Sequence, residues 1–349
     1  MSALIDVLPA HRFDVERLAA CLSDHEPGLG RIAVRQFQGG QSNPTYLLET
    51  GAGRFVLRKK PPGPLLPSAH QVEREYRVIS ALYGSEVPVP RPVMLCEDPD
   101  VIGTAFYVME YVDGRIFERP DLDGLPPAGR RALYDAMNGT IAALHRVDWA
   151  AAGLTGFGRT ENFLARQIDR WTRQYRASIV GEADPVMEEL IAWLGANTPA
   201  DSVVTIAHGD FRLGNLIFAP DAPRVAAVLD WELSTLGDPL GDLAYCCLPY
   251  HLPAGVDGVK GLQGLDLAAL GIPSEEEFVA SYCRRTGRDG IAGWTFYLTF
   301  SLFRLTAILQ GVYARAVQGN AANANALEVG KRAALLARTA RVLAFGQGH

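Results

Sequence analysis

The segment His208-Gly209-Asp210-Phe211-Arg212-Leu213-Gly214-Asn215 places an aspartate and an asparagine five positions apart, directly after a strand-like run at residues 203–207. Phosphoryl transfer has a physical use for this spacing, because one short loop then holds two different groups in register. The Asp210 carboxylate can accept or orient the proton of an acceptor hydroxyl, and the Asn215 amide oxygen can coordinate a Mg²⁺ ion that bridges phosphates. For this segment taken alone, an Asx-rich turn after a strand is the alternative.

A second segment, at residues 225–230, favours a phosphoryl-transfer site over a plain turn. Residues 225–229 read Val-Ala-Ala-Val-Leu, which predicts a buried strand, and Asp230 follows at its end, fifteen residues after Asn215. A strand-terminal aspartate by itself is more often a cap or a turn former. Mg²⁺ prefers carboxylate and carbonyl oxygens and keeps several waters, so one asparagine and one aspartate are enough when phosphates complete the shell. Together the two segments predict a metal site at Asn215 and Asp230.

These segments resemble the aminoglycoside phosphotransferase and choline kinase group, which are small-molecule relatives of the protein kinases. The longer run at residues 229–239, Leu-Asp-Trp-Glu-Leu-Ser-Thr-Leu-Gly-Asp-Pro, is more specific. It is similar to the branch that includes the kinase-like domain fused to acyl-CoA dehydrogenases in some animal proteins. The resemblance covers nearly the whole chain. It implies an α+β, bilobal, protein-kinase-like fold with a β-rich N-lobe and a mainly helical C-lobe.

The order of the predicted elements agrees with that fold. Strand-like runs and glycine turns dominate the first 110 residues, and helical periodicity dominates the remainder. The composition changes most sharply at residues 110–114, which predicts an interlobe hinge. We therefore expect a nucleotide-binding lobe at residues 1–110 and a catalytic and acceptor-binding lobe at residues 111–349.

The segment Gly39-Gly40-Gln41-Ser42-Asn43 lies between two predicted strands, where a kinase carries the loop whose backbone approaches the phosphates. We therefore predict nucleotide contacts from Gly39, Gly40, Ser42 and Asn43. The segment lacks the full G-x-G-x-x-G pattern, so a plain hairpin turn is the alternative.

The third predicted strand contains Phe55-Val56-Leu57-Arg58, which matches the kinase V-A-I-K motif with Arg58 in place of the lysine. The neighbouring Lys59 is a rival for the phosphate contact, although alternation along a strand places it on the opposite face. The resemblance also implies a glutamate partner on the following helix. Glu75 fits because it lies on the apolar side of that helix, whereas Glu73 is predicted to be solvated.

Further roles follow from the resemblance alone. The hinge backbone would bind the adenine through the Glu110 carbonyl and the Val112 amide, so side chains do not decide between ATP and GTP. Arg212 occupies the place of a lysine that contacts the γ-phosphate in many Ser/Thr kinases, where a cation offsets developing charge. An exposed loop arginine is the alternative. Asp242 and His208 match residues with structural roles around the catalytic loop.

Composition and charge exclude several classes of protein. A net charge of −6 and scattered basic residues argue against nucleic-acid binding. The five cysteines are odd in number and match no metal spacing, which predicts reduced thiols and a cytoplasmic location. The most apolar run, residues 291–303, is shorter than the roughly 20 residues that a bilayer requires. We expect no membrane association and infer no obligate protein partner.

The predicted activity is transfer of the γ-phosphate of ATP to a hydroxyl of a small molecule, with Mg²⁺ as cofactor and GTP not excluded. A nucleotide-binding pseudokinase and an aminoglycoside-type antibiotic phosphotransferase are the alternatives. Residues 291–317 are apolar and carry Arg304 and Arg315 without an acidic residue, which disfavours a polycationic acceptor. Eleven residues apart, the two arginines share a helical face and favour a hydroxyacyl or carboxylate-bearing acceptor. A structural ion pair for Arg304 is the alternative.

Overall fold

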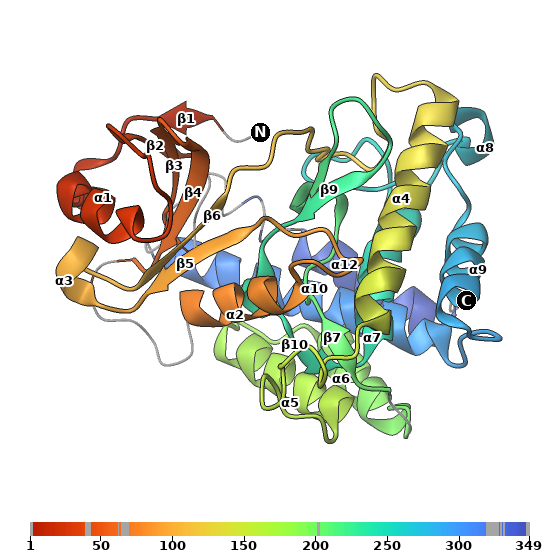
Figure 1. Cartoon of the computed structure of the whole chain (residues 1–349). Helices are drawn as coiled ribbons and strands as arrows, with labels where there is room; N and C mark the ends of the chain where they lie inside the picture. Colours follow the sequence, from red (N-terminus) through yellow and green to blue (C-terminus); the bar gives the residue numbers. More distant parts are fainter. Residues whose placement is uncertain are drawn as a thin grey trace. The chain divides into compact units, whose positions relative to one another are not determined.

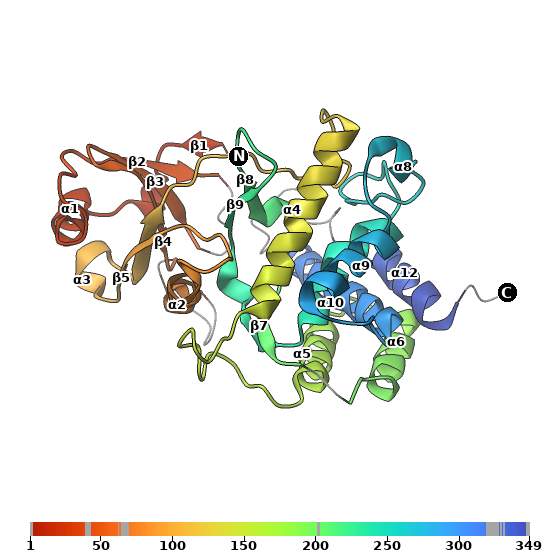
Figure 2. The same cartoon turned by 45° about the vertical axis from the view of Figure 1, so that its right-hand side comes forward.

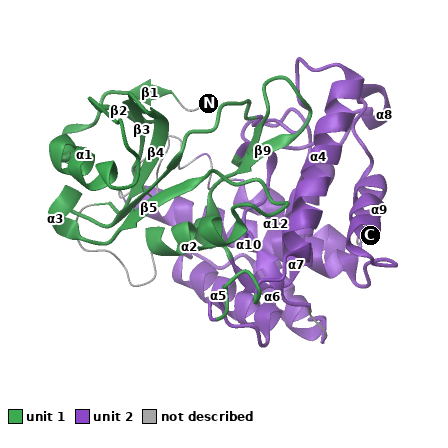
Figure 3. Cartoon of the chain, in the orientation of Figure 1, with its two compact units in different colours: residues 1–116, 150–155, 215–234 green, residues 117–149, 156–214, 235–349 purple. Residues whose placement is uncertain are grey.

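The computed structural model describes residues 3–38, 43–61, 63, 70–200, 203–318, 328, 330 and 332–346 of the 349-residue chain. The chain forms two compact units, drawn in green and purple in Figure 3. Unit 1 comprises residues 1–116, 150–155 and 215–234, and unit 2 comprises residues 117–149, 156–214 and 235–349. Each unit is assembled from three stretches of chain, whereas the predicted lobes are continuous. The assignment of functions to residues 1–110 and 111–349 stays a prediction.

Unit 1 is built on a six-stranded antiparallel sheet with the order β1-β2-β3-β4-β6-β5 (Figure 1). The strands are β1 (Leu4–Ile5), β2 (Ala33–Phe37), β3 (Thr45–Thr50), β4 (Gly53–Lys59), β5 (Pro92–Cys96) and β6 (Phe106–Glu110). In the turn between β3 and β4, Gly53 has a φ of 137°, which favours glycine. This hairpin fixes the register of β4, so Arg58 lies between Thr45 and Tyr107.

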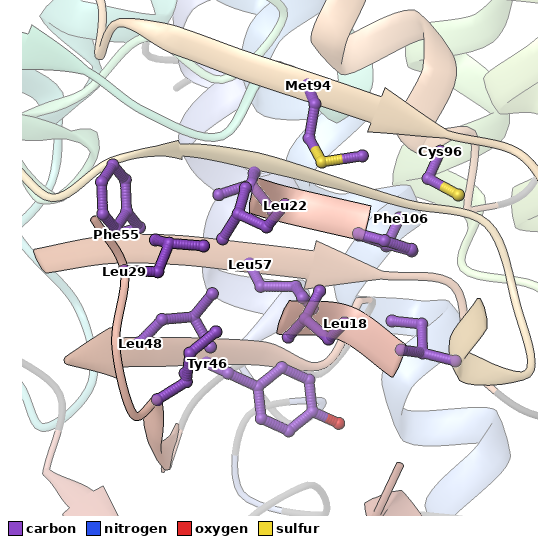
Figure 4. Close-up of a cluster of buried hydrophobic side chains, with 13 residues drawn as sticks. Leu18, Leu22, Leu29, Tyr46, Leu48, Phe55, Leu57, Met94, Cys96 and Phe106 are labelled. Carbon is purple, nitrogen blue, oxygen red and sulfur yellow. The ribbon is translucent and has the colours of Figure 1, made fainter. Parts of the chain in front are cut away.

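Three helices accompany this sheet: α1 (Val15–Ser23), α2 (Val72–Leu82) and α3 (Pro99–Ile102). The Asp14 carboxylate caps α1 by accepting hydrogen bonds from the next turn, as an N-cap aspartate does. Leu18 and Leu22 of α1 then pack into a buried cluster with Tyr46, Leu57 and other side chains of the sheet (Figure 4). This apolar contact holds α1 against the sheet.

A short hairpin completes unit 1. Its strands are β8 (Leu216–Phe218) and β9 (Val225–Val228), which pair antiparallel with Leu216 opposite Val228. Beyond this pair the Leu229 N–H donates to the Asn215 carbonyl at 2.9 Å. The two ends of the hairpin therefore lie side by side, and Asp230 follows directly after one of them.

Unit 2 is mainly helical (Figure 2). Its helices are α4 (Pro127–Arg146), α5 (Phe163–Ala177), α6 (Pro185–Ala196), α7 (Pro239–Cys247), α8 (Leu267–Leu270), α9 (Glu275–Thr286), α10 (Trp294–Val317) and α12 (Ala333–Phe345). The central helix α10 packs against α5, α7 and α12, and α4 lies along α9. Strands β7 (Thr205–Ala207) and β10 (Thr235–Gly237) form a small antiparallel ladder beneath the loop that starts at His208. Among the described helices, none combines the length and apolar character needed to cross a membrane.

The predicted α+β fold is confirmed, with a strand-rich first part and a mainly helical remainder. The sequence gives no signal for β5, because a run of prolines at positions 88, 90 and 92 conceals it. An edge strand tolerates a proline at its first residue, and β5 is the edge of the sheet.

Candidate active site

The predicted site residues are distributed over both units, and each group has a defined environment within its own unit. In unit 1 the centre is Arg58 on β4. Its guanidinium lies 2.9 Å from the Glu75 carboxylate, 3.4 Å from Asp230 and 4.0 Å from Glu232. The Arg58 side chain is 12% exposed and that of Glu75 is 0% exposed, so the pair is buried.

Opposing charges keep Arg58 cationic in this buried position. Burial by itself disfavours the charged guanidinium, but the Glu75 and Asp230 carboxylates outweigh it and raise the pKa of Arg58. Burial also disfavours the charged form of Glu75 and so raises the pKa of its carboxyl group, and the Arg58 charge opposes that rise. Two further donors stabilise the Glu75 carboxylate: the Tyr107 hydroxyl at 3.1 Å and the Asn43 amide at 2.8 Å.

The structure separates Lys59 from this cluster. Lys59 is buried, donates to the Ile102 carbonyl at 3.0 Å and lies 5.3 Å from the centre of the Phe13 ring. Successive side chains of β4 point to opposite faces of the sheet, so only one of the two basic residues can face Glu75. Arg58 takes that place, and Lys59 packs against α3 and the segment before α1.

Of the predicted phosphate-loop residues, Gly39, Gly40 and Ser42 lie outside the described residues. Asn43 is described and fully buried. Its amide nitrogen donates to Glu75, and its amide oxygen lies 3.2 Å from the His70 ring. The Asn43 side chain is therefore engaged with protein groups, and its effect on a nucleotide would pass through Glu75.

Asn215 and Asp230, the predicted metal ligands, flank the β8–β9 hairpin of unit 1. Asp230 has a φ of 68°, a left-handed conformation that aspartate tolerates better than most residues. Asn215 is buried, whereas the Asp230 side chain is 36% exposed. Groups of three or more His, Cys, Asp or Glu side chains suited to a metal ion are absent from the described part of the chain. The pair thus offers one amide and one carboxylate, a donor set that suits Mg²⁺ when phosphates supply further oxygens.

The predicted hinge residues Glu110 and Val112 line a pocket of about 370 Å³ within unit 1. The pocket is formed by the segment after β6, the loop before β5 and the β8–β9 hairpin, and its walls include Val89, Ala219 and Ala226. Charged side chains, including Arg91, Asp113 and Arg224, also line it. The position agrees with the predicted adenine contact, which itself stays a prediction.

In unit 2 the backbone of the loop at residues 208–210 is held by Asp242, at the start of α7. The Asp242 carboxylate accepts from the His208 N–H at 2.5 Å and from the Gly209 N–H at 2.9 Å. The buried His208 ring accepts from the Asp210 N–H at 3.1 Å. Burial disfavours the ionised carboxylate, but His145 at 3.6 Å and these donors prevail and lower the pKa of Asp242. The structural roles predicted for Asp242 and His208 are confirmed by these contacts.

Arg212 and Tyr245, both in unit 2, contact the Asp210 side chain. The Arg212 Nε lies 3.3 Å from its Oδ2 atom, and the Tyr245 hydroxyl is hydrogen-bonded to it. Burial raises the pKa of Tyr245, and the Asp210 charge adds to the rise, so the hydroxyl keeps its proton and donates. Arg212 also lies 3.8 Å from Glu118, which in turn pairs with Lys260. Tyr245, Glu118 and Lys260 lie far from the motif in sequence, and no sequence signal pointed to them.

A second pocket, of about 280 Å³, lies wholly within unit 2 and is lined by Arg212 and Leu213 of this loop. Most of its walls are apolar, including Met137, Leu305 and Leu309. Among the residues that the structure describes, the charged ones that line it are Glu118, Arg212, Lys260 and Arg332. Three cations and one carboxylate give the lining a net charge of +2.

The two arginines of α10 have different surroundings. Arg304 donates to the Gly209 carbonyl and lies over the rings of Trp171 and Tyr245, at 5.4 and 5.8 Å from their centres. Arg315 is exposed near the end of the helix. Thus Arg304 contacts the loop of Asp210 and Arg315 does not share that contact.

A β-sheet unit with a buried basic–glutamate pair and a helical unit with an aspartate-bearing loop are the two parts of a protein-kinase-like phosphotransferase. The chain belongs to the phosphotransferase enzyme family, whose model matches residues 33–297. A crystal structure from Ralstonia eutropha, provisionally described as an aminoglycoside phosphotransferase, is 48% identical, with a TM-score of 0.87 over 95% of this chain and 98% of that one. An aminoglycoside phosphotransferase in ternary complex with ADP and hygromycin B has 15% identity and a TM-score of 0.60 over 95% of this chain and 99% of that one, and shows the fold alone.

Curated relatives extend the similarity to longer proteins. Acyl-CoA dehydrogenase family member 10 of Mus musculus is 48% identical over 91% of this chain, and family member 11 of Homo sapiens is 45% identical over 91%. The chain spans only 30% and 41% of the length of these two proteins. The predicted resemblance to the kinase-like part of such proteins is confirmed.

We predict that Arg58→Met destabilises the protein by about 3–5 kcal/mol, because Glu75 would keep a buried charge without its partner. Arg54→Met, on the same strand, is the matched control, since Arg54 pairs with Asp113 at an exposed position. Its expected cost is about 0–1 kcal/mol. Urea unfolding measures both free energies, and the double variant Arg58→Met/Glu75→Met should recover part of the loss. Equal costs for Arg58→Met and Arg54→Met would contradict a dependence on the buried pair.

Proposed function

We propose that the protein is a small-molecule kinase that transfers the γ-phosphate of ATP to an acceptor hydroxyl, with Asp210 as the catalytic residue. The observation that carries this proposal is the fixed loop of residues 208–210, whose backbone Asp242 holds while Arg212 and Tyr245 contact the Asp210 carboxylate. Structural neighbours crystallised with ADP or AMP-PNP support a nucleotide donor. GTP stays an alternative, because the predicted hinge contacts are backbone contacts.

In the proposed mechanism, Arg58 binds the nucleotide phosphates and Glu75 holds it in place. The Glu110 carbonyl and the Val112 amide receive the adenine. Asn215 and Asp230 would hold Mg²⁺, which when bound neutralises phosphate charge and orients the transferred group. The loop backbone near Gly39, Gly40 and Ser42 would cover the phosphates.

Asp210 then accepts or orients the proton of the acceptor hydroxyl. The hydroxyl oxygen attacks the γ-phosphorus of ATP, and the bond between this phosphorus and the leaving ADP breaks. Arg212 offsets charge on the transferred group. Five residues of chain join Asp210 to Asn215, so their Cα atoms can never be more than roughly 18 Å apart. This covalent link supports a joint role for the two residues.

The pocket of unit 2 supports an acceptor with an apolar chain and an anionic group. Its walls are largely apolar, and among the described lining residues the cations Arg212, Lys260 and Arg332 outnumber the carboxylate of Glu118. A polycationic aminoglycoside would require the opposite charge. We therefore propose a hydroxyacyl or carboxylate-bearing hydroxy compound as acceptor, rather than an antibiotic.

We predict that Asp210→Asn lowers phosphoryl transfer by roughly 10²- to 10⁴-fold and leaves nucleotide affinity nearly unchanged, because an amide cannot take the hydroxyl proton. Single-turnover transfer and fluorescent-nucleotide titration measure the two effects separately. Asp169→Asn on α5 is the control, since Asp169 pairs with the exposed Arg173. Near-normal transfer by Asp210→Asn would remove this residue from the mechanism.

We predict that Asp230→Ala abolishes Mg²⁺-dependent nucleotide binding, whereas Asn215→Ala weakens it less, because a carboxylate carries a full charge and an amide only a dipole. Nucleotide binding and activity are titrated with Mg²⁺ for each variant. Asp221→Ala, at an exposed position of the same hairpin, should behave like the parent protein. Mild and equal effects of Asp230→Ala and Asn215→Ala would argue against a shared metal site.

We predict ATP consumption with hydroxyacyl-CoA thioesters or free hydroxy acids, and none with aminoglycosides, because the unit 2 pocket is apolar and net cationic. A coupled ADP-release assay over such a panel, with the Asp210→Asn variant as blank, makes the comparison. Turnover with aminoglycosides alone would overturn the proposed acceptor class. Nucleotide binding without turnover on any acceptor would favour the pseudokinase alternative.

A further inference from the structure

Arg304 directly follows the apolar run at residues 291–303, and its charge meets no carboxylate in the described part of the structure. Its guanidinium donates to the Gly209 carbonyl, one residue before Asp210. A charged group in such surroundings is costly unless its hydrogen bonds are directed at a specific partner. Within the described part of the chain, the partner that the structure shows is the backbone of the loop itself and not a protein carboxylate.

Two aromatic rings orient the guanidinium toward that carbonyl. Trp171 on α5 and Tyr245 on α7 lie 5.4 and 5.8 Å from it, within the range of cation–π attraction. The Arg304 Nε is buried without a hydrogen-bond partner among the described residues. The planar group is thus fixed by ring contacts on its sides and by one strong hydrogen bond at its end.

We infer that Arg304 is a positioning residue, which locks the peptide unit before Asp210 through the Gly209 carbonyl. Asp242 holds the donors of the same loop, the N–H groups of His208 and Gly209. Arg304 donates to the carbonyl oxygen of Gly209. The Asp242 carboxylate on α7 and the Arg304 guanidinium on α10 therefore fix the N–H and the C=O of Gly209 with opposite charges. Glycine adopts a φ of 84° here, a conformation that an isolated chain would leave easily. This inference rests on the proposed catalytic role of Asp210.

A competing use of Arg304 is an anion site shared with Arg170 on α5. Arg170 lies 5.4 Å from the centre of the same Trp171 ring. Both guanidinium groups therefore lie 5.4 Å from the centre of one indole ring. Arg170 is nevertheless exposed, and one N–H group of Arg304 already donates a hydrogen bond to the Gly209 carbonyl. These contacts favour the positioning role and make anion binding the outcome to test against.

The experiment compares Arg304→Met, Arg304→Lys and the control Arg176→Met, whose exposed arginine pairs with Glu188 on α6. For each variant, kcat and KM for nucleotide and acceptor are measured together with amide hydrogen exchange of residues 208–214. We expect Arg304→Met to lower kcat by about 10- to 100-fold, the worth of a charged hydrogen bond, with both KM values nearly unchanged. Exchange of residues 208–214 should rise by a similar factor. Arg304→Lys, which keeps a cationic donor, should recover part of both effects.

Three results would overturn the inference. Normal kcat with normal exchange in Arg304→Met would mean that the contact has no effect on the loop. A raised KM for the acceptor with normal exchange would assign Arg304 to an anionic group of the substrate. Faster exchange throughout unit 2, without recovery in Arg304→Lys, would assign it to packing alone. If the parent protein transfers no phosphate to any acceptor, the proposed function fails, and the exchange of residues 208–214 still decides the role of Arg304.

Discussion

The hydrogen-bond and ion-pair network around the buried Glu75 carboxylate is the interaction on which unit 1 depends. This carboxylate accepts from Arg58 on β4, Tyr107 on β6 and Asn43 in the segment before β3, so it joins α2 to two strands and to that segment. A buried carboxylate is costly unless donors surround it, and those donors in turn become fixed in direction. Because Arg58 also contacts Asp230, this network extends to the end of the β8–β9 hairpin.

In unit 2 a buried carboxylate likewise fixes the donors around it, but these donors are backbone N–H groups. The Asp242 carboxylate is buried and accepts from the backbone of residues 208 and 209, so it orders a loop rather than a side chain. Both carboxylates gain their directionality from burial, because competing water is excluded. In each unit the residue proposed to act on substrate is therefore held by a group that need not touch substrate.

Sequence reasoning found the residues whose chemistry depends on local spacing. Asp210 and Asp230 come after strands and Asn215 comes directly before one. The pairing of Arg58 with Glu75 was implied by the family resemblance, and helix periodicity favoured Glu75 over Glu73. It could not find Tyr245, Glu118 or Lys260, because their proximity to Asp210 and Arg212 arises from packing of distant segments. It also assigned Asn43 to the nucleotide, whereas the side chain is bonded to Glu75 through a contact between segments 32 residues apart.

The sequence by itself determined the fold class, the family and the identity of the groups available for phosphoryl transfer. These depend on residue types at short, fixed spacings along the chain. Only the tertiary structure showed that Arg58 faces Glu75 on α2, whereas Lys59 lies on the opposite face of the sheet with Ile102 and Phe13. It alone also decided the partner of Arg304. A charged residue in an apolar helix indicates that it has a partner, because burying an unpaired charge is costly. The identity of that partner depends on which loop the fold brings next to the helix.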